Sequence, residues 1–170
     1  CRAADTTAVL FCYALGKAQR LLAELARLTD RRVLLHGAMA PLVDVYRAAG
    51  VPMLPTEVVI EQARGSRLGG ELVMAPPLAI GSTWMRRFRR LSTGFASGWM
   101  QVRGNRRRRG HDRGFVLSDH ADWPALLHTI EQTGARRSLA THGNTDALVQ
   151  VLRDAGYDAH ALRTQLGGES

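Results

Sequence analysis

The chain has 170 residues, 45% of them hydrophobic, and a formal net charge of +8 with an isoelectric point near 10.9. This length and apolar content exclude a chain that is disordered throughout, and they fit one domain or two small lobes. The sequence has no apolar run of about 18 residues, which excludes a membrane-spanning helix. The charge favours polyanionic partners such as nucleic acid.

The two cysteines, Cys1 and Cys12, follow no pairing pattern, so we expect neither a disulfide framework nor a thiolate metal site. No secretory signal is visible, and we expect a cytoplasmic protein in a reducing compartment. The chain opens without a methionine and leads at once into a strand-like segment. We interpret it as a piece of a longer protein.

The first part of the chain alternates strand-like and helical patterns. We expect a strand over residues 9–13, a turn at Gly16 and a helix from Lys17 whose apolar face carries Leu21, Leu22, Leu25 and Leu28. A second strand covers residues 33–35, and a helix over residues 41–49 begins with a proline and stops at Gly50. A third strand lies in ELVMAPP, after a loop over residues 62–70.

The second part continues the alternation. STWMRRFRR fits one or two helical turns, and a brief strand is expected around residues 99–102, followed by a charged loop. GFVLSD, RSLATHG and YDAHAL read as strands, and a helix capped by Asp122 separates the first two. A last helix, NTDALVQVLRDAG, closes at Gly156. Alternating strands and helices predict an α/β fold with mostly parallel sheets flanked by helices.

Three of the expected strands end in groups that can do chemistry. His36 follows the second strand, Ser118-Asp119-His120 follows GFVL, and Thr141-His142-Gly143 follows RSLA. In open α/β sheets ligands bind at the carboxyl ends of the strands, and imidazole serves as a metal ligand or as an acid or base. If the strands before His120 and His142 are neighbours in one sheet, both side chains point into one crevice.

Each of these residues also has a plain structural interpretation. Asp119 or Asp122 caps the helix that follows, and His36 is a core or edge histidine. His128 is structural within its helix, His111 is solvated in a charged loop, and no partner for His160 can be named from the sequence.

Arginines are concentrated between residues 86 and 113. This window holds ten of the chain's 22 arginines, with Asp112 as its one acid, and Trp84, Phe88 and Trp99 lie in or beside it. Such a block neutralises phosphates, while aromatic rings stack on unpaired bases. The alternatives are a solvated hairpin or a contact with another subunit. No recognition helix for reading base sequence is visible.

The segments YALGKAQRLLAEL, LHGAM, VMAPP, SGWMQVRGNRRRRGHDRGFVLSDHADWPALL and LATHGNTDAL together resemble the C-terminal half of a β-CASP nuclease with a metallo-β-lactamase fold. The resemblance is nearest to bacterial DNA ligase-associated DNA exonucleases, which are also described as similar to mRNA 3′-end processing factors. It covers essentially the whole chain, and the order of the motifs makes it specific.

This resemblance implies a fold and a set of roles. Residues 1–113 would be part of a β-CASP domain, and residues 114–170 would return to the metallo-β-lactamase domain. His120 and Asp119 would be the catalytic residues, with His120 as the acid at the leaving group, and His142 would be a ligand in a site for two zinc ions. The residues expected to contact nucleic acid are Lys17, Arg86, Arg87, Arg103, Arg106, Arg107, Arg108, Arg109 and Arg113.

The chain departs from the family pattern in the metal site. The motif His-x-His-x-Asp-His is absent, as are the further metal-ligating His and Asp and the acid that orients the leaving-group His. We therefore expect this chain alone to be inactive and to fold poorly, and expect the intact protein to hydrolyse phosphodiester bonds in DNA repair with a ligase and a helicase. The alternatives are an RNA-processing enzyme and a non-catalytic nucleic-acid-binding module that uses the arginine block.

Overall fold

The computed structural model describes residues 5–59, 68–102, 110–141 and 145–162. They form two compact units, residues 1–119 and residues 120–170, each with its own sheet. Within the described residues, no helix is long and apolar enough to cross a membrane.

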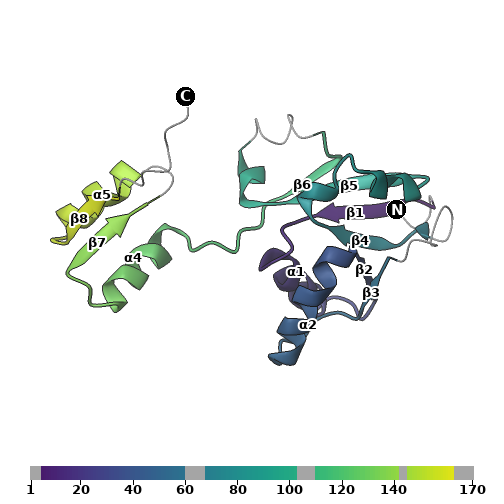
Figure 1. Ribbon diagram of the computed structural model, residues 1–170, viewed down its shortest axis with the longest axis horizontal. Helices are drawn as coiled ribbons and strands as arrows, with labels where there is room; N and C mark the ends of the chain where they lie inside the picture. Colours follow the sequence, from purple (N-terminus) through teal and green to yellow (C-terminus); the bar gives the residue numbers. More distant parts are fainter. Residues whose placement is uncertain (1–4, 60–67, 103–109, 142–144, 163–170) are drawn as a thin grey trace. The chain divides into compact units, whose positions relative to one another are not determined.

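The first unit is built on a six-stranded sheet in the order β3-β2-β4-β1-β5-β6, in which every neighbouring pair is parallel (Figure 1). Its strands are β1 (Thr7–Phe11), β2 (Val33–Leu35), β3 (Thr56–Val58), β4 (Leu72–Ala75), β5 (Leu91–Ala96) and β6 (Arg113–Phe115). A fully parallel sheet needs cover on both faces, so its central strands are apolar on both sides. Val73, Met74 and Ala75 of β4 accordingly have no measurable exposure.

Two α-helices, α1 (Lys17–Leu25) and α2 (Ala40–Ala48), lie together on one side of this sheet (Figure 1). Leu22 and Val43 bring them into a core with Leu35 and Met74. Short 3₁₀ segments contribute to the core on the other face, where Met100 and Ala79 pack with Phe11, Phe88 and Phe95. These segments are η4 (Pro77–Ala79), η5 (Thr83–Arg87) and η6 (Gly98–Gln101). A further 3₁₀ segment, η2 (Gly37–Met39), leads into α2 on the helical side of the sheet.

The second unit contains α4 (Trp123–Gln132), β7 (Arg137–Ala140), α5 (Thr145–Asp154) and β8 (Asp158–Ala161). β7 and β8 form a parallel pair connected through α5. Ala140 and Ala159 pack with Val149 and Leu152 of α5 in a small core, which Leu127 and Ile130 of α4 also join. Leu139, which alternates with the buried positions of β7, is 54% exposed.

The parallel α/β character and most elements are as predicted from the sequence. The helices α1, α2, α4 and α5 and the strands β2, β4, β7 and β8 lie where the pattern indicated, and Asp122 caps α4 by accepting from the Ala125 backbone N–H at 2.9 Å. Gly50 and Gly156 end their helices with φ of 82° and 87°. The expected leucine face of the first helix is too long, because α1 ends at Leu25 and Leu28 is 82% exposed.

The region before β6 was predicted wrongly. The expected strand at residues 99–102 is a 3₁₀ turn, and β5 precedes it. β5 reads LSTGFA, so small and polar residues hide its strand character. Gly94 in its middle is needed for packing, because a Cβ there would lie 2.9 Å from the Phe115 ring. Phe115 and Val116, two apolar residues of GFVLSD, are 48% and 51% exposed, since β6 is an edge strand.

Candidate site at the carboxyl edge of the six-stranded sheet

The strands β1 and β5 are neighbours in the sheet, and the segments that follow their carboxyl ends cross to opposite faces of it. From β1 the chain enters α1, whose Ala18 and Leu22 pack on the helical face, and from β5 it enters η6, whose Met100 packs on the opposite face. Neighbouring parallel strands whose connections diverge in this way leave a crevice beyond their carboxyl ends, which is the usual ligand position in α/β sheets. The segment after β6 runs into this place.

A partly buried ion pair joins the two sequence motifs that end there. The Lys17 Nζ lies 2.5 Å from Asp119 Oδ1, and the two side chains are 5% and 27% exposed. The same ammonium lies 4.9 Å from the centre of the Tyr13 ring, a cation–π contact. YALGK and SDHAD, which are 102 residues apart at this pair, are therefore one structural unit.

Backbone contacts on either side of the ion pair complete the connection. Arg20 Nη1 donates to the Ser118 carbonyl at 2.5 Å, and a Cβ at Gly98, just after β5, would lie 3.4 Å from Ser118 Cβ. Gly16 has φ 80° and ψ −68°, and the Leu15 carbonyl accepts from the Lys17 N–H at 3.0 Å. This is a γ-turn centred on Gly16, a strained conformation for any residue with a Cβ.

The turn before α1 also shapes the electrostatics of the site. A lysine at the first position of a helix opposes the positive end of the helix dipole, whereas a carboxylate there is favoured. The Asp119 carboxylate offsets the positive charge of Lys17 and the positive end of the helix dipole. It lies close to the start of α1, because its Oδ2 would be 2.5 Å from a Cβ placed on Gly16. Beneath the turn, burial raises the pKa of the Cys12 thiol to about 12, partly offset by the Lys17 charge. Cys12 is thus a neutral, fully buried thiol at physiological pH.

The structure distinguishes the two acids of the SDHAD motif. Asp122 caps α4, while Asp119 pairs with Lys17. His120, the first residue of the second unit, is exposed. Lys17, expected to contact nucleic acid, is 4% exposed and its ammonium is directed at a carboxylate. A contact between Lys17 and phosphate stays a prediction.

The expected zinc ligand lies outside the described residues, which include Thr141 but not His142. Among the residues that the structure does describe, no three His, Cys, Asp or Glu side chains are grouped so that they could hold a metal ion. These residues on their own do not fit a zinc site. β6 and β7 belong to different sheets, so the sheet adjacency expected to bring His120 and His142 together is not present between them.

The arginine block divides between described and undescribed residues. Arg103 and Arg106 to Arg109 lie outside the described ranges. Arg86, Arg89, Arg90 and Arg113 are exposed, as expected for solvent-facing or phosphate-binding residues. Arg90 lies at the amino end of the sheet, since its carbonyl accepts from the Thr7 N–H. The described arginines therefore do not all face the carboxyl edge.

Arg87 belongs to a second cluster, beyond the carboxyl ends of β2 and β3. Its guanidinium lies 5.0 Å from the Trp84 ring, and its Nε donates to the Trp84 carbonyl at 2.8 Å. The His36 ring contacts Trp84 edge-on at 4.8 Å, and His36 Nδ1 accepts from the Ala38 N–H at 3.1 Å. Partial burial and then the Arg87 charge lower the pKa of His36 below its ordinary value. His36 is thus the edge histidine that the sequence suggested.

Three further histidines make contacts that the sequence did not indicate. His111 is not solvated: it is half-buried, with its ring stacked on Phe95 at 5.2 Å. His128 is 64% exposed and contacts Glu131 at 3.7 Å, so it is not a core residue of α4. His160 does have a partner, since its Nε2 lies 2.6 Å from Asp158 Oδ1.

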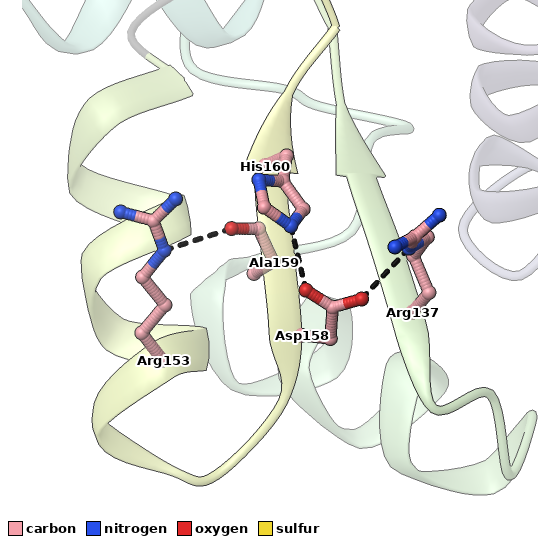
Figure 2. A network of polar contacts seen from close by, with 5 residues as sticks. All are labelled: Arg137, Arg153, Asp158, Ala159 and His160. Carbon is pink, nitrogen blue, oxygen red and sulfur yellow. Dashed lines mark hydrogen bonds and ion pairs between the residues drawn. The ribbon is translucent and has the colours of Figure 1, made fainter.

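Figure 2 shows Asp158 between His160 and Arg137, with Arg153 bonded to the Ala159 carbonyl nearby. Arg137 Nε donates to Asp158 Oδ2 at 2.7 Å, and this bond, followed by that from His160, lowers the pKa of Asp158. β7 and β8 place these residues side by side because Arg137 is in register with Asp158. The network links the two strands at their amino ends.

Sequence reasoning missed the residues that hold the motifs together. No sequence motif marked Arg20 or Gly16 as functional. Arg20 contacts a backbone carbonyl, and Gly16 contributes through its backbone conformation. The glycine immediately before a helix, in a strand-turn-helix pattern, was the available sign of a special turn.

The chain is 35% identical over 159 residues to a probable DNA ligase from Opitutus terrae. The match includes 93% of this chain and 15% of the relative, so the chain spans about 15% of the length of that protein. No family model matches the chain. No solved structure matches it either.

Proposed function

We propose that this chain is the C-terminal part of a zinc-dependent DNA exonuclease of the β-CASP group, acting in repair beside a DNA ligase and a helicase. In this proposal, residues 1–113 belong to the β-CASP domain and residues 114–170 to the metallo-β-lactamase domain. The observation that carries it is the meeting of SDHAD with YALGK at the carboxyl edge of a parallel sheet. The similarity to part of a probable DNA ligase supports a role in DNA processing.

The proposed reaction is hydrolysis of a phosphodiester bond. The oxygen of a water molecule bonds to phosphorus, the bond from phosphorus to the leaving oxygen breaks, and that oxygen takes up a proton. His120 would donate this proton, because a positioned imidazole can act as a general acid and the residue is exposed. Asp119 lies in the same motif but is engaged by Lys17, so its role is to fix the segment.

The cofactor in this proposal is a pair of zinc ions, with His142 as the ligand that this chain supplies. The remaining ligands would come from the N-terminal half of the intact protein, because the family's His-x-His-x-Asp-His motif is absent from this sequence. Zinc binding by His and carboxylate side chains is ordinary coordination chemistry.

Arginines 86, 87, 103, 106 to 109 and 113 would bind the phosphates of the substrate. Of the three that are described, Arg86 and Arg113 are exposed, and Arg87 lies beside Trp84. Replacing Arg106 to Arg109 by alanine should weaken DNA binding and flatten its salt dependence, with the slope falling by roughly one for each phosphate that is no longer neutralised. An unchanged slope would remove these four residues from the interface.

Two variants of the full-length protein that contains this chain test the division of roles. His120→Ala should abolish cleavage and leave the zinc content nearly intact, while His142→Ala should lower both. Zinc content is measured by atomic emission on purified protein, and cleavage by release of label from end-labelled DNA. Equal loss of zinc in the two variants would contradict the proposed roles.

A second candidate is a nucleic-acid-binding module without catalysis, favoured by the exposed arginines of the block. In that case His120→Ala would leave every property of the full-length protein unchanged, while the arginine variants would still lose binding. An RNA-processing enzyme would show the same residue dependence with labelled RNA as the preferred substrate.

A further inference from the structure

We propose that Lys17 is a positioning residue that acts on His120 through Asp119, and that it is not a phosphate contact. This inference rests on the proposed function, since it assigns a role at the same site. It follows from where the ammonium lies and from what holds it there.

The charge of Lys17 is withdrawn from the surface. Its side chain is 5% exposed, and its Nζ contacts the Asp119 carboxylate and the Tyr13 ring. A phosphate would have to displace Asp119 to reach this ammonium, and separating the two is costly because the buried Lys17 charge would lose its partner. A surface arginine binds phosphate without that cost.

The turn that carries Lys17 is rigid. Gln19, itself 1% exposed, donates from Nε2 to the Ala14 carbonyl at 2.9 Å, and the Ala18 N–H bonds to the Tyr13 carbonyl at 3.2 Å. Together with the γ-turn at Gly16, these bonds fix residues 13–20 on the end of β1. We call these residues the Lys17 turn.

The Lys17 turn contacts the SDHAD motif at two successive residues. Arg20 holds the Ser118 carbonyl, and Lys17 holds the Asp119 side chain. The next α-carbon along the chain is that of His120, about 3.8 Å from that of Asp119. Fixing a backbone at two adjacent residues restricts the third, and a displacement of about 1 Å at a catalytic group can lower a rate roughly a hundredfold.

The test uses the full-length protein and four variants. Lys17→Met and Asp119→Asn each remove one side of the pair, and Arg20→Met removes the exposed second contact, with little risk to folding. Arg27→Met is the matched control, because it removes a cation just beyond α1, where Arg27 is 78% exposed and paired with Glu24.

On end-labelled DNA, Lys17→Met should lower kcat roughly a hundredfold and leave KM within about twofold. Asp119→Asn should do the same, the double variant should be no worse than the poorer single variant, and Arg20→Met should show a smaller loss. Arg27→Met should equal the wild type. The proposal is overturned if Lys17→Met instead raises KM and lowers the salt slope of binding by about one at unchanged kcat, as a phosphate contact would.

A second readout does not depend on activity. The imidazole signals of His120, assigned by their loss in His120→Gln, are followed by NMR in each variant. They should shift in Lys17→Met and Arg20→Met and stay in place in Arg27→Met. Unmoved signals in the first two would refute the positioning role even if the protein is a nuclease. If the wild type is inactive but the His120 signals shift in Lys17→Met and Arg20→Met, the nuclease assignment is refuted, while the positioning of His120 by Lys17 is supported.

Discussion

Replacing Gly16 by alanine probes the site through its backbone. Gly16 has φ 80° and ψ −68°, and an added Cβ would lie 2.5 Å from Asp119 Oδ2. The strained conformation costs about 1–3 kcal/mol for a residue with a Cβ. The carboxylate must also move away from the buried ammonium of Lys17, so we expect a total loss of about 3–4 kcal/mol.

Gly50→Ala is the matched control. Gly50 has φ 82°, but a Cβ there meets nothing within 4 Å. Its replacement should cost about 1–2 kcal/mol, the ordinary penalty of a left-handed residue. The difference between the two variants therefore contains the displacement of Asp119 together with the difference in backbone strain between the two turns, and the double variant described below separates the two contributions.

The assay is urea unfolding of the chain followed by tryptophan fluorescence in a Trp123→Phe background. Trp84 and Trp99 then report on the first unit, which contains Gly16. The steric part of the cost should disappear in a Gly16→Ala, Asp119→Ala double variant, because the clashing carboxylate is gone. Equal losses for Gly16→Ala and Gly50→Ala, within about 0.5 kcal/mol, would refute the close approach of Gly16 and Asp119.

Two further predictions concern the ionisable groups. In a double-mutant cycle, Asp119→Asn should lower the free energy of unfolding more than Lys17→Met does, because the Lys17 side chain left without its partner is 5% exposed whereas that of Asp119 is 27% exposed. Urea unfolding should give a coupling energy of about 1–3 kcal/mol between the two residues. Additive losses would argue against the pair. His36 has a lowered pKa, so as the pH falls below about 6.5 the unfolded chain takes up a proton that the folded chain resists, and the free energy of unfolding should decrease. His36→Asn keeps an acceptor for the Ala38 N–H and should remove that part of the pH dependence, whereas an identical pH profile in the variant would show that His36 is not the group responsible.

The sequence predicted the elements whose signals are local. Pro41, Gly50, Asp122 and Gly156 mark helix ends through their own conformations or hydrogen bonds, and the structure places them there. β5 was missed because its strand character depends on neighbours: Gly94 is required by the Phe115 ring and by Leu10, both distant in sequence.

The candidate site was predicted in part. The SDHAD motif was recognised, but its connection to Lys17 spans 102 residues and cannot be read from spacing. The resemblance of YALGK to a β-CASP segment suggested a phosphate contact for Lys17, and the pairing of its ammonium with Asp119 could not be read from that segment. The burial of His111 and the partner of His160 could not be predicted for the same reason, since the Phe95 ring and Asp158 become their neighbours through the folding of the sheets.

We propose that this chain belongs to a nuclease that works on DNA. The direct measurement is digestion of end-labelled DNA and RNA by the full-length protein, with and without a chelator, beside the His120→Ala variant. We expect DNA to be degraded from an end, with loss of activity in the chelator and in the variant. Binding of DNA without release of label under any of these conditions would contradict the claim.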